Sequence, residues 1–304
     1  MLEVRRITTK SGINTAAKGV ISVAVSQDGQ RILAGTVDKR VLCLDQKGRV
    51  CWVRETSNQP WRVALSADGQ LAVMGTGSTR PWDMRGRGIT GFDKDGNPQW
   101  SHDLNASVWG LDLSADDRTL VVGTDGHQAI LFNEAGQRLW QQDVKGIGWQ
   151  GWVWAAAVSA GGETVVIGTA NKQVLILDRG GNLLGEHRAE ADVFTVDISA
   201  DGQTITAGSG DQQVYLLDRT GAPLWQERVE DKIWAVALST EGQHVIVGAG
   251  EKEAHLRAFD RSGQPRWKRY IKGGMGGLAL SDEPKRIIVG TRQGHIYIFD
   301  NEGE

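Results

Sequence analysis

The sequence predicts an all-β fold, a seven-bladed β-propeller with four antiparallel strands per blade, built as a single domain over residues 1–304. Three observations predict it. A similar segment recurs seven times at intervals of 40 to 48 residues, each copy holds four short strand patterns, and no helical 3.6-residue apolar stripe lies between them. A four-stranded unit at this period is typical of a propeller blade, which buries its faces by stacking around an axis.

Each copy is recognised by one serine at the end of its first strand. These anchor serines are Ser26, Ser66, Ser114, Ser159, Ser199, Ser239 and Ser281. Several are followed by Asp-Gly, which favours a tight hairpin because glycine adopts positive φ freely. The second strand ends near a glycine, where we expect close approach of a neighbouring backbone. The third strand is rich in branched and aromatic residues, and the fourth follows an Asp-x-x-Gly turn.

The seventh copy ends at Asp300, where its fourth strand would begin. The N-terminal segment from Glu3 to Thr9 carries a strand pattern that belongs to no other copy. We therefore expect residues near 3–9 to complete the seventh blade, close the ring and remove a free sheet edge. On this interpretation we expect the domain to be complete as given.

The pattern V-A-x-S-x-D-G, then G-T-x-D and V-x-L-x-D, resembles the WD-repeat propellers, and the following D-x-x-G-x-x-x-W resembles the quinoprotein (PQQ-like) repeat. The resemblance runs from about Ile21 to Gly303 and concerns the fold, since one fold hosts many functions. The third strands end in Leu-Asp or Phe-Asp rather than Trp-Asp. Quinone-dependent dehydrogenases of this type generally have eight blades, a calcium site and adjacent cysteines, none of which this sequence predicts.

The net charge and the lack of long apolar runs restrict the classes of partner that we expect. With 34 basic and 37 acidic residues the net charge is -3, which argues against nucleic acid, because phosphate contacts need clustered Lys and Arg. No apolar run is long enough to span a membrane, and no secretory signal opens the chain. We expect a cytoplasmic monomer. The two cysteines, Cys43 and Cys51, are interpreted as small buried hydrophobes.

The twelve tryptophans fall into three classes. The first class lies four residues after the Asp-x-x-Gly glycine, and Gly185 replaces it in one blade; its members are Trp52, Trp100, Trp140, Trp225 and Trp267. A repeated aromatic residue in an outer strand indicates packing between blades.

The second class lies five residues before the anchor serine, at the start of the strand that lines the axis. It consists of Trp61, Trp109, Trp154, Phe194 and Trp234, with Ile21 and Gly276 as exceptions. Seven-fold repetition places these residues around one mouth of the central channel, open towards Ile21 and Gly276. They either plug the tapering channel or line an aromatic binding pocket, and the sequence favours neither strongly.

The third class, Trp82, Trp149 and Trp152, lies in loops that are longer than in the other copies. These loop types open on the same face as the second class. Loops that depart from a repeat are where function is expected. Arginine and aromatic residues are frequent in binding hot spots, so Arg80, Arg85 and Arg87 beside Trp82 join the candidate binding residues.

Catalytic signals are weak. The six histidines form no metal-ligand spacing, and no nucleophile elbow or phosphate loop occurs. Asp112 and Asp197 take a first-strand position that is alanine elsewhere; we expect them to be solvated or bonded to neighbouring backbone rather than catalytic. The sequence therefore predicts a binding or scaffold propeller, not an enzyme, with no cofactor or metal. Its partner would be a protein, a peptide or a small ligand that stacks on aromatic rings.

Two alternatives stay open. One is a quinone- or metal-dependent oxidoreductase or lyase with its site in the central channel. Only Asp112 and Asp197 support this alternative. The other is a sugar-binding, lectin-like propeller or a sensor module, since sugars and quaternary ammonium groups also stack on tryptophan.

Overall fold

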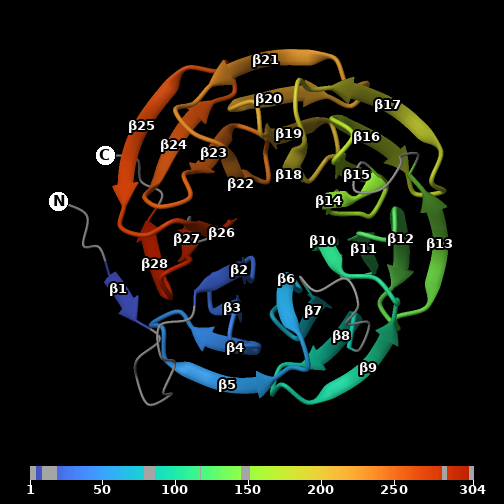
Figure 1. The fold of residues 1–304 in the computed structure, drawn as a ribbon, viewed down its shortest axis with the longest axis vertical. Helices are drawn as coiled ribbons and strands as arrows, with labels where there is room; N and C mark the ends of the chain where they lie inside the picture. Colours follow the sequence, from blue (N-terminus) through green and yellow to red (C-terminus); the bar gives the residue numbers. More distant parts are fainter. Residues whose placement is uncertain are drawn as a thin grey trace.

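The computed structural model describes residues 5–8, 19–78, 86–116, 118–144, 151–282 and 286–300, with the backbone alone for 5–8 and Asp300. These residues form seven antiparallel four-stranded sheets arranged as a ring around a central axis (Figure 1). The predicted seven-bladed propeller is confirmed. A helix able to span a membrane does not occur in the described ranges.

The strands follow one another from the axis outwards in each blade. Blade one contains β2 (Val20–Val25), β3 (Arg31–Thr36), β4 (Arg40–Asp45) and β5 (Val50–Glu55); blade two, β6 (Gln59–Leu65), β7 (Leu71–Gly77), β8 (Gly88–Asp93) and β9 (Pro98–Asp103); blade three, β10 (Val108–Leu113), β11 (Thr119–Thr124), β12 (Gln128–Asn133) and β13 (Arg138–Asp143); blade four, β14 (Val153–Val158), β15 (Thr164–Thr169), β16 (Gln173–Asp178) and β17 (Leu183–Arg188). Blade five contains β18 (Val193–Ile198), β19 (Thr204–Ser209), β20 (Gln213–Asp218) and β21 (Pro223–Arg228); blade six, β22 (Ile233–Leu238), β23 (His244–Ala249), β24 (Ala254–Asp260) and β25 (Pro265–Ile271); blade seven, β26 (Met275–Leu280), β27 (Arg286–Thr291), β28 (His295–Asp300) and the N-terminal β1 (Arg5–Thr8).

The ring closes through the N-terminal strand, as the sequence predicted. β1 pairs antiparallel with β28, from Arg5 opposite Ile298 to Thr8 opposite His295, and lies at the outer edge of blade seven (Figure 1). Nearer the axis, blades seven and one are also joined where Asp282 N donates to Gln27 O at 3.1 Å. The two ends of the chain therefore share one sheet, and closure does not depend on side-chain packing alone.

The anchor serines fix the turn at the end of every first strand. Ser66 Oγ donates to Asp68 Oδ1 at 2.7 Å and accepts from Leu71 N at 2.9 Å. In all seven copies the backbone N–H five residues after the anchor donates to its hydroxyl. In four copies the hydroxyl also donates to the aspartate two residues on, and the bonds together hold the hairpin and set the start of the second strand.

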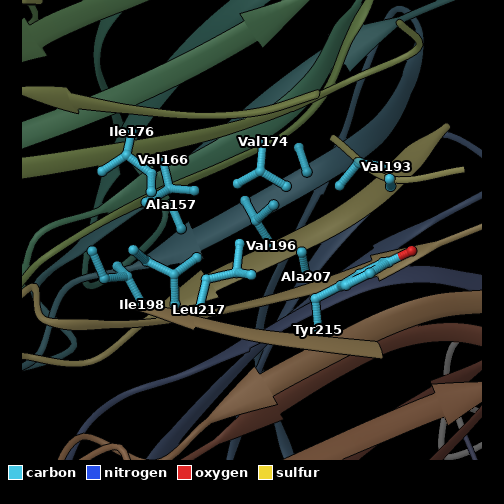
Figure 2. Close-up of a cluster of buried hydrophobic side chains, with 13 residues drawn as sticks. Ala157, Val166, Val174, Ile176, Val193, Val196, Ile198, Ala207, Tyr215 and Leu217 are labelled. Atoms are coloured by element: carbon cyan, nitrogen blue, oxygen red, sulfur yellow. The ribbon is translucent and has the colours of Figure 1, made fainter. Parts of the chain in front are cut away.

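The hydrophobic core lies between the blades. One cluster joins Val174 and Ile176 of blade four to Val196 and Ile198 of blade five (Figure 2). The second-strand glycines make this contact close: a Cβ on Gly168 would lie 2.8 Å from Val193 Cγ1. The close approach was expected, but the approaching group in most blades is an apolar side chain from the next first strand rather than backbone.

Outer-strand tryptophans pack across the same interfaces, as predicted. The indole N–H of each of three donates to a turn carbonyl of the next blade, in the pairs Trp52–Lys94, Trp140–Arg179 and Trp225–Arg261, at 2.9 to 3.0 Å. Where Gly185 replaces tryptophan, the backbone of Thr220 in the next blade takes up the space. Each of these rings therefore fills a gap and satisfies its own polar group.

The interpretation of both cysteines as buried is half wrong. Cys43 on β4 is buried, but Cys51 on β5 is exposed, and both are free. Side chains alternate along a strand, so with Trp52 turned inward its neighbour Cys51 faces solvent. Burial first, and Cys51 nearby, raise the pKa of the Cys43 thiol to about 11, which keeps it protonated.

Deleting residues 1–10 removes β1 and exposes the edge of β28. We expect the free energy of unfolding of the whole ring to fall by about 2 kcal/mol or more, because closure is lost. Urea denaturation of the two proteins measures this. Deleting only residues 1–4 is the control; an unchanged midpoint in the longer deletion would contradict closure by β1.

Gly185→Ala places a methyl group against the backbone of Thr220, which cannot rotate away. We expect a loss of about 1–3 kcal/mol in the free energy of unfolding, as for overpacking. Gly161→Ala is the matched control, because a Cβ there meets nothing within 4 Å. Equal stability of the two variants in thermal denaturation would show that the blade-four interface is not tightly packed.

Candidate functional site

Every first strand carries a β-bulge at the same place. The pairing between first and second strand skips one residue in each blade, and the skipped residues are Ile21, Trp61, Trp109, Trp154, Phe194, Trp234 and Gly276. A bulge leaves its residue unpaired and redirects its side chain. The five aromatic residues singled out in the sequence are thus the bulged residues of five consecutive blades, two to six.

These five side chains, here called the aromatic wall, touch one another in blade order. Ring centroids are 4.8 Å apart for Trp61 and Trp109, 5.1 Å for Trp109 and Trp154, 6.0 Å for Trp154 and Phe194, and 5.0 Å for Phe194 and Trp234. The first and last pairs are stacked, and the middle two meet edge to face. Such contacts hold the rings in defined orientations.

The wall follows the ring of blades rather than filling its centre. Among the described residues, each ring contacts only the rings of neighbouring blades, apart from Trp152; none reaches across the axis. All five side chains stay partly exposed. A plug would bring rings from opposite blades together and bury them, so this geometry favours a wall around an opening.

At the bulge position of blades seven and one the described residues are not aromatic. Gly276 lies against the backbone of Val20, which leaves no room for a side chain, and Ile21 is buried. Arg292, between β27 and β28, covers the end of the wall instead. Its guanidinium carbon lies 4.7 Å from the centre of the Trp234 ring, and its Nε donates to Met275 O at 3.1 Å.

The residues proposed from the long loops are placed only in part. Trp152 lies in the wall face, with its ring 6.2 Å from Trp109 in a stacked orientation and 5.2 Å from Trp154. Arg87 is buried, so its side chain is not part of an open binding surface. The other four candidates, Trp82, Trp149, Arg80 and Arg85, lie outside the described residues.

Below the wall, the first strands enclose an axial cavity of about 450 Å³. Asp112 and Asp197 line it, and each carboxylate accepts two backbone N–H groups. Asp112 accepts from Leu113 and from Val158 of the next blade, both at 2.9 Å. Asp197 accepts from Ile198 at 2.8 Å and from Leu238 of the next blade at 2.7 Å. The expected bonding to neighbouring backbone is confirmed.

Enclosure in the cavity changes the acidity of both carboxyl groups. Burial first, and the charge of Asp197 second, raise the pKa of Asp112 to about 7. Burial raises the pKa of Asp197 to about 6. Desolvation disfavours the charged form more than the backbone bonds favour it. At neutral pH the cavity therefore holds less negative charge than two free carboxylates would carry.

Sequence reasoning missed Arg62, one residue after the bulge of blade two. Its side chain lines the axial cavity, where the equivalent residues of the other blades are small: Ser22, Gly110, Ala155, Thr195, Ala235 and Gly277. The sequence does contain this information, because Arg62 is a long, charged residue at a position that is small in the other six copies. It becomes visible only when the copies are aligned position by position. Arg292 was missed because it lies outside the compared strands.

A comparison with protein families relates the chain to PQQ-type repeats. A family model described as outer membrane protein assembly factor BamB matches residues 8–143, 37–199 and 174–304. Overlapping matches are expected when a model of several repeats is aligned with a longer array of the same repeat. No curated protein matches the sequence.

The two cavity carboxyls make stability depend on pH. Their pKa values are raised on folding, so the native state keeps protons that the unfolded chain releases above about pH 4, and stability falls as pH rises through about 6 to 7. Between about pH 5 and about pH 8 we expect the double variant Asp112→Asn, Asp197→Asn to lose a pH-dependent change in the free energy of unfolding of about 4 kcal/mol. Urea denaturation at about pH 5 and about pH 8 measures this change. If the free energy of unfolding changes equally between the two pH values in the variant and the unaltered protein, the assignment is contradicted.

Proposed function

The chain belongs to the family of BamB-like PQQ-repeat propellers, and from that premise we propose that it is a non-catalytic binding or scaffold protein that holds a ligand against the aromatic wall. The observation that supports this most is the repeated bulge, which turns five consecutive aromatic side chains to one channel mouth. Bulges that redirect side chains are over-represented near functional sites. The family description as an assembly factor is consistent with a binding role.

The wall has the properties of a binding surface. Its rings are partly exposed yet held by their neighbours, so a ligand gains apolar contact without paying for ordering mobile side chains. Arg292 adds a cation at one end, over Trp234. Aromatic residues and arginine in a concave setting are the usual contents of a binding hot spot.

The oxidoreductase alternative has less support from the residues. The acidic side chains lining the described cavity are Asp112, Asp197 and Asp282, and each accepts hydrogen bonds from the protein itself. Cys43 and Cys51 lie on β4 and β5, outside the cavity lining. In the described ranges no three acidic, histidine or cysteine side chains gather as metal ligands would. These residues do not fit a calcium-quinone centre.

Replacing a wall residue separates binding from stability. A thermal-shift screen of metabolites, saccharides and short peptides identifies ligands, and calorimetry measures their affinity. We expect Trp109→Ala to weaken binding by about 2 kcal/mol or more, as for a hot spot. Trp140→Ala, an inter-blade tryptophan, is the control: it lowers stability and leaves affinity unchanged. If Trp109→Ala binds as tightly as the unaltered protein, the proposed function is wrong.

A further inference from the structure

Arg62 crosses the channel mouth at the base of the aromatic wall. It leaves blade two directly after the bulged Trp61, and its Nη1 donates to Trp61 O at 3.1 Å. Its Nη2 donates to Trp154 O in blade four at 3.4 Å. The side chain therefore reaches from blade two to the bulge of blade four, and it borders the axial cavity. This position lies against the backbone of two wall residues, Trp61 and Trp154.

The charge of Arg62 has no counterion in the described part of the chain. The ion pairs found there involve other residues. Burial alone lowers the pKa of Arg62 to about 10, without an acidic neighbour to offset it, so the group is still cationic at neutral pH. Enclosing a cation beside backbone carbonyls only is costly. Two of its five N–H donors bond to described residues, and the other three have no partner among them.

The wall beside Arg62 also carries enclosed hydrogen-bond donors that have no partner within the described ranges. The indole N–H groups of Trp61, Trp109, Trp154 and Trp234 are enclosed and have no acceptor among the described residues. Indole and guanidinium donate hydrogen bonds and accept none, and an enclosed donor left without a partner costs about 1–3 kcal/mol. The outer tryptophans differ, because Trp52 and Trp140 donate to carbonyls of the next blade. Unpaired indole donors are thus a property of the wall.

A cation without a counterion and partly exposed aromatic faces together favour a ligand that carries an anion and an aromatic ring. We propose that the ligand of the aromatic wall is a carboxylate attached to an aromatic body, and that the Arg62 guanidinium binds the carboxylate while the rings stack on the wall. The inference rests on the proposed binding function and adds the chemistry of the ligand. Arginine binds a carboxylate through paired N–H donors, which would supply the anion that this partly buried cation lacks. A free aromatic acid and a peptide with an aromatic C-terminal residue share this chemistry.

The test uses four probes and calorimetry on the full chain. The probes are N-acetylphenylalanine, its amide, and a short peptide ending in phenylalanine with a free or an amidated C-terminus. We expect each acid to bind at least about tenfold more tightly than its amide, since charge-assisted bonds to the carboxylate are lost in the amide. Binding of the peptide acid alone identifies a chain terminus as the source of the ligand, and binding of both acids identifies the aromatic acid itself as sufficient.

Arg62→Met removes the charge and keeps an unbranched apolar side chain. We expect it to bind the acid as weakly as the amide, and Arg62→Lys to retain part of the preference. Arg188→Met, an exposed residue on β17, is the control and is expected to bind like the unaltered protein. Thermal denaturation of each variant verifies that the ring is folded. An acid preference that persists in Arg62→Met, or equal binding of acid and amide by the unaltered protein, overturns the inference.

The outcomes separate this inference from the proposed function. If Trp109→Ala abolishes binding of screened ligands that carry no carboxylate, and the four probes do not bind, the wall binds ligands and the inference about Arg62 is wrong. If Trp109→Ala changes the affinity of no ligand, both proposals are wrong. Loss of acid binding in Arg62→Met together with loss of all binding in Trp109→Ala supports both.

Discussion

A single four-stranded blade of this chain is apolar on both faces and buries neither of them alone. The interface between blades is therefore the interaction on which the whole structure depends. Each interface combines a second-strand glycine, an apolar residue of the next first strand, and in several cases an outer tryptophan bonded to the next turn. Every blade needs a neighbour on both faces, so blade seven must pack against blade one. The N-terminal strand β1 completes the sheet of blade seven.

Closure of the ring also forms the candidate site. In a closed ring the same position of each first strand returns at the same height around the axis, so one bulge per blade produces a circle of redirected side chains. Rigid blades hold that circle, and the side chains on it differ from blade to blade, except that Gly276 has no room for a side chain. The chain uses this freedom unevenly. Five blades carry aromatic rings, blade two adds Arg62, and the junction of blades seven and one is left to Arg292.

The blade architecture could be predicted from the sequence, because seven copies of one pattern remove the uncertainty of assigning strands in a single copy. Seven anchor serines predict the blades, and the missing seventh outer strand predicts the role of the N-terminus. The bulge was not predictable, since it is a skip in pairing register and leaves no residue type of its own. Cys51 was misplaced because burial was assigned by residue type rather than by alternation along β5. Arg62 was missed because a comparison of repeats detects residues that recur. A residue present in one copy alone is found only when each position is aligned across all copies.

The central claim is that the wall tryptophans and the inter-blade tryptophans have different roles, although all sit at repeated positions. Nitrogen-15 NMR of the indole N–H groups tests it directly, with each signal assigned by single substitution and an aromatic acid added as ligand. The account predicts that the signals of Trp61, Trp109, Trp154 and Trp234 shift, while those of Trp52, Trp140 and Trp225, already bonded to carbonyls, stay in place. Shifts confined to the inter-blade group, or spread equally over both groups, would contradict it.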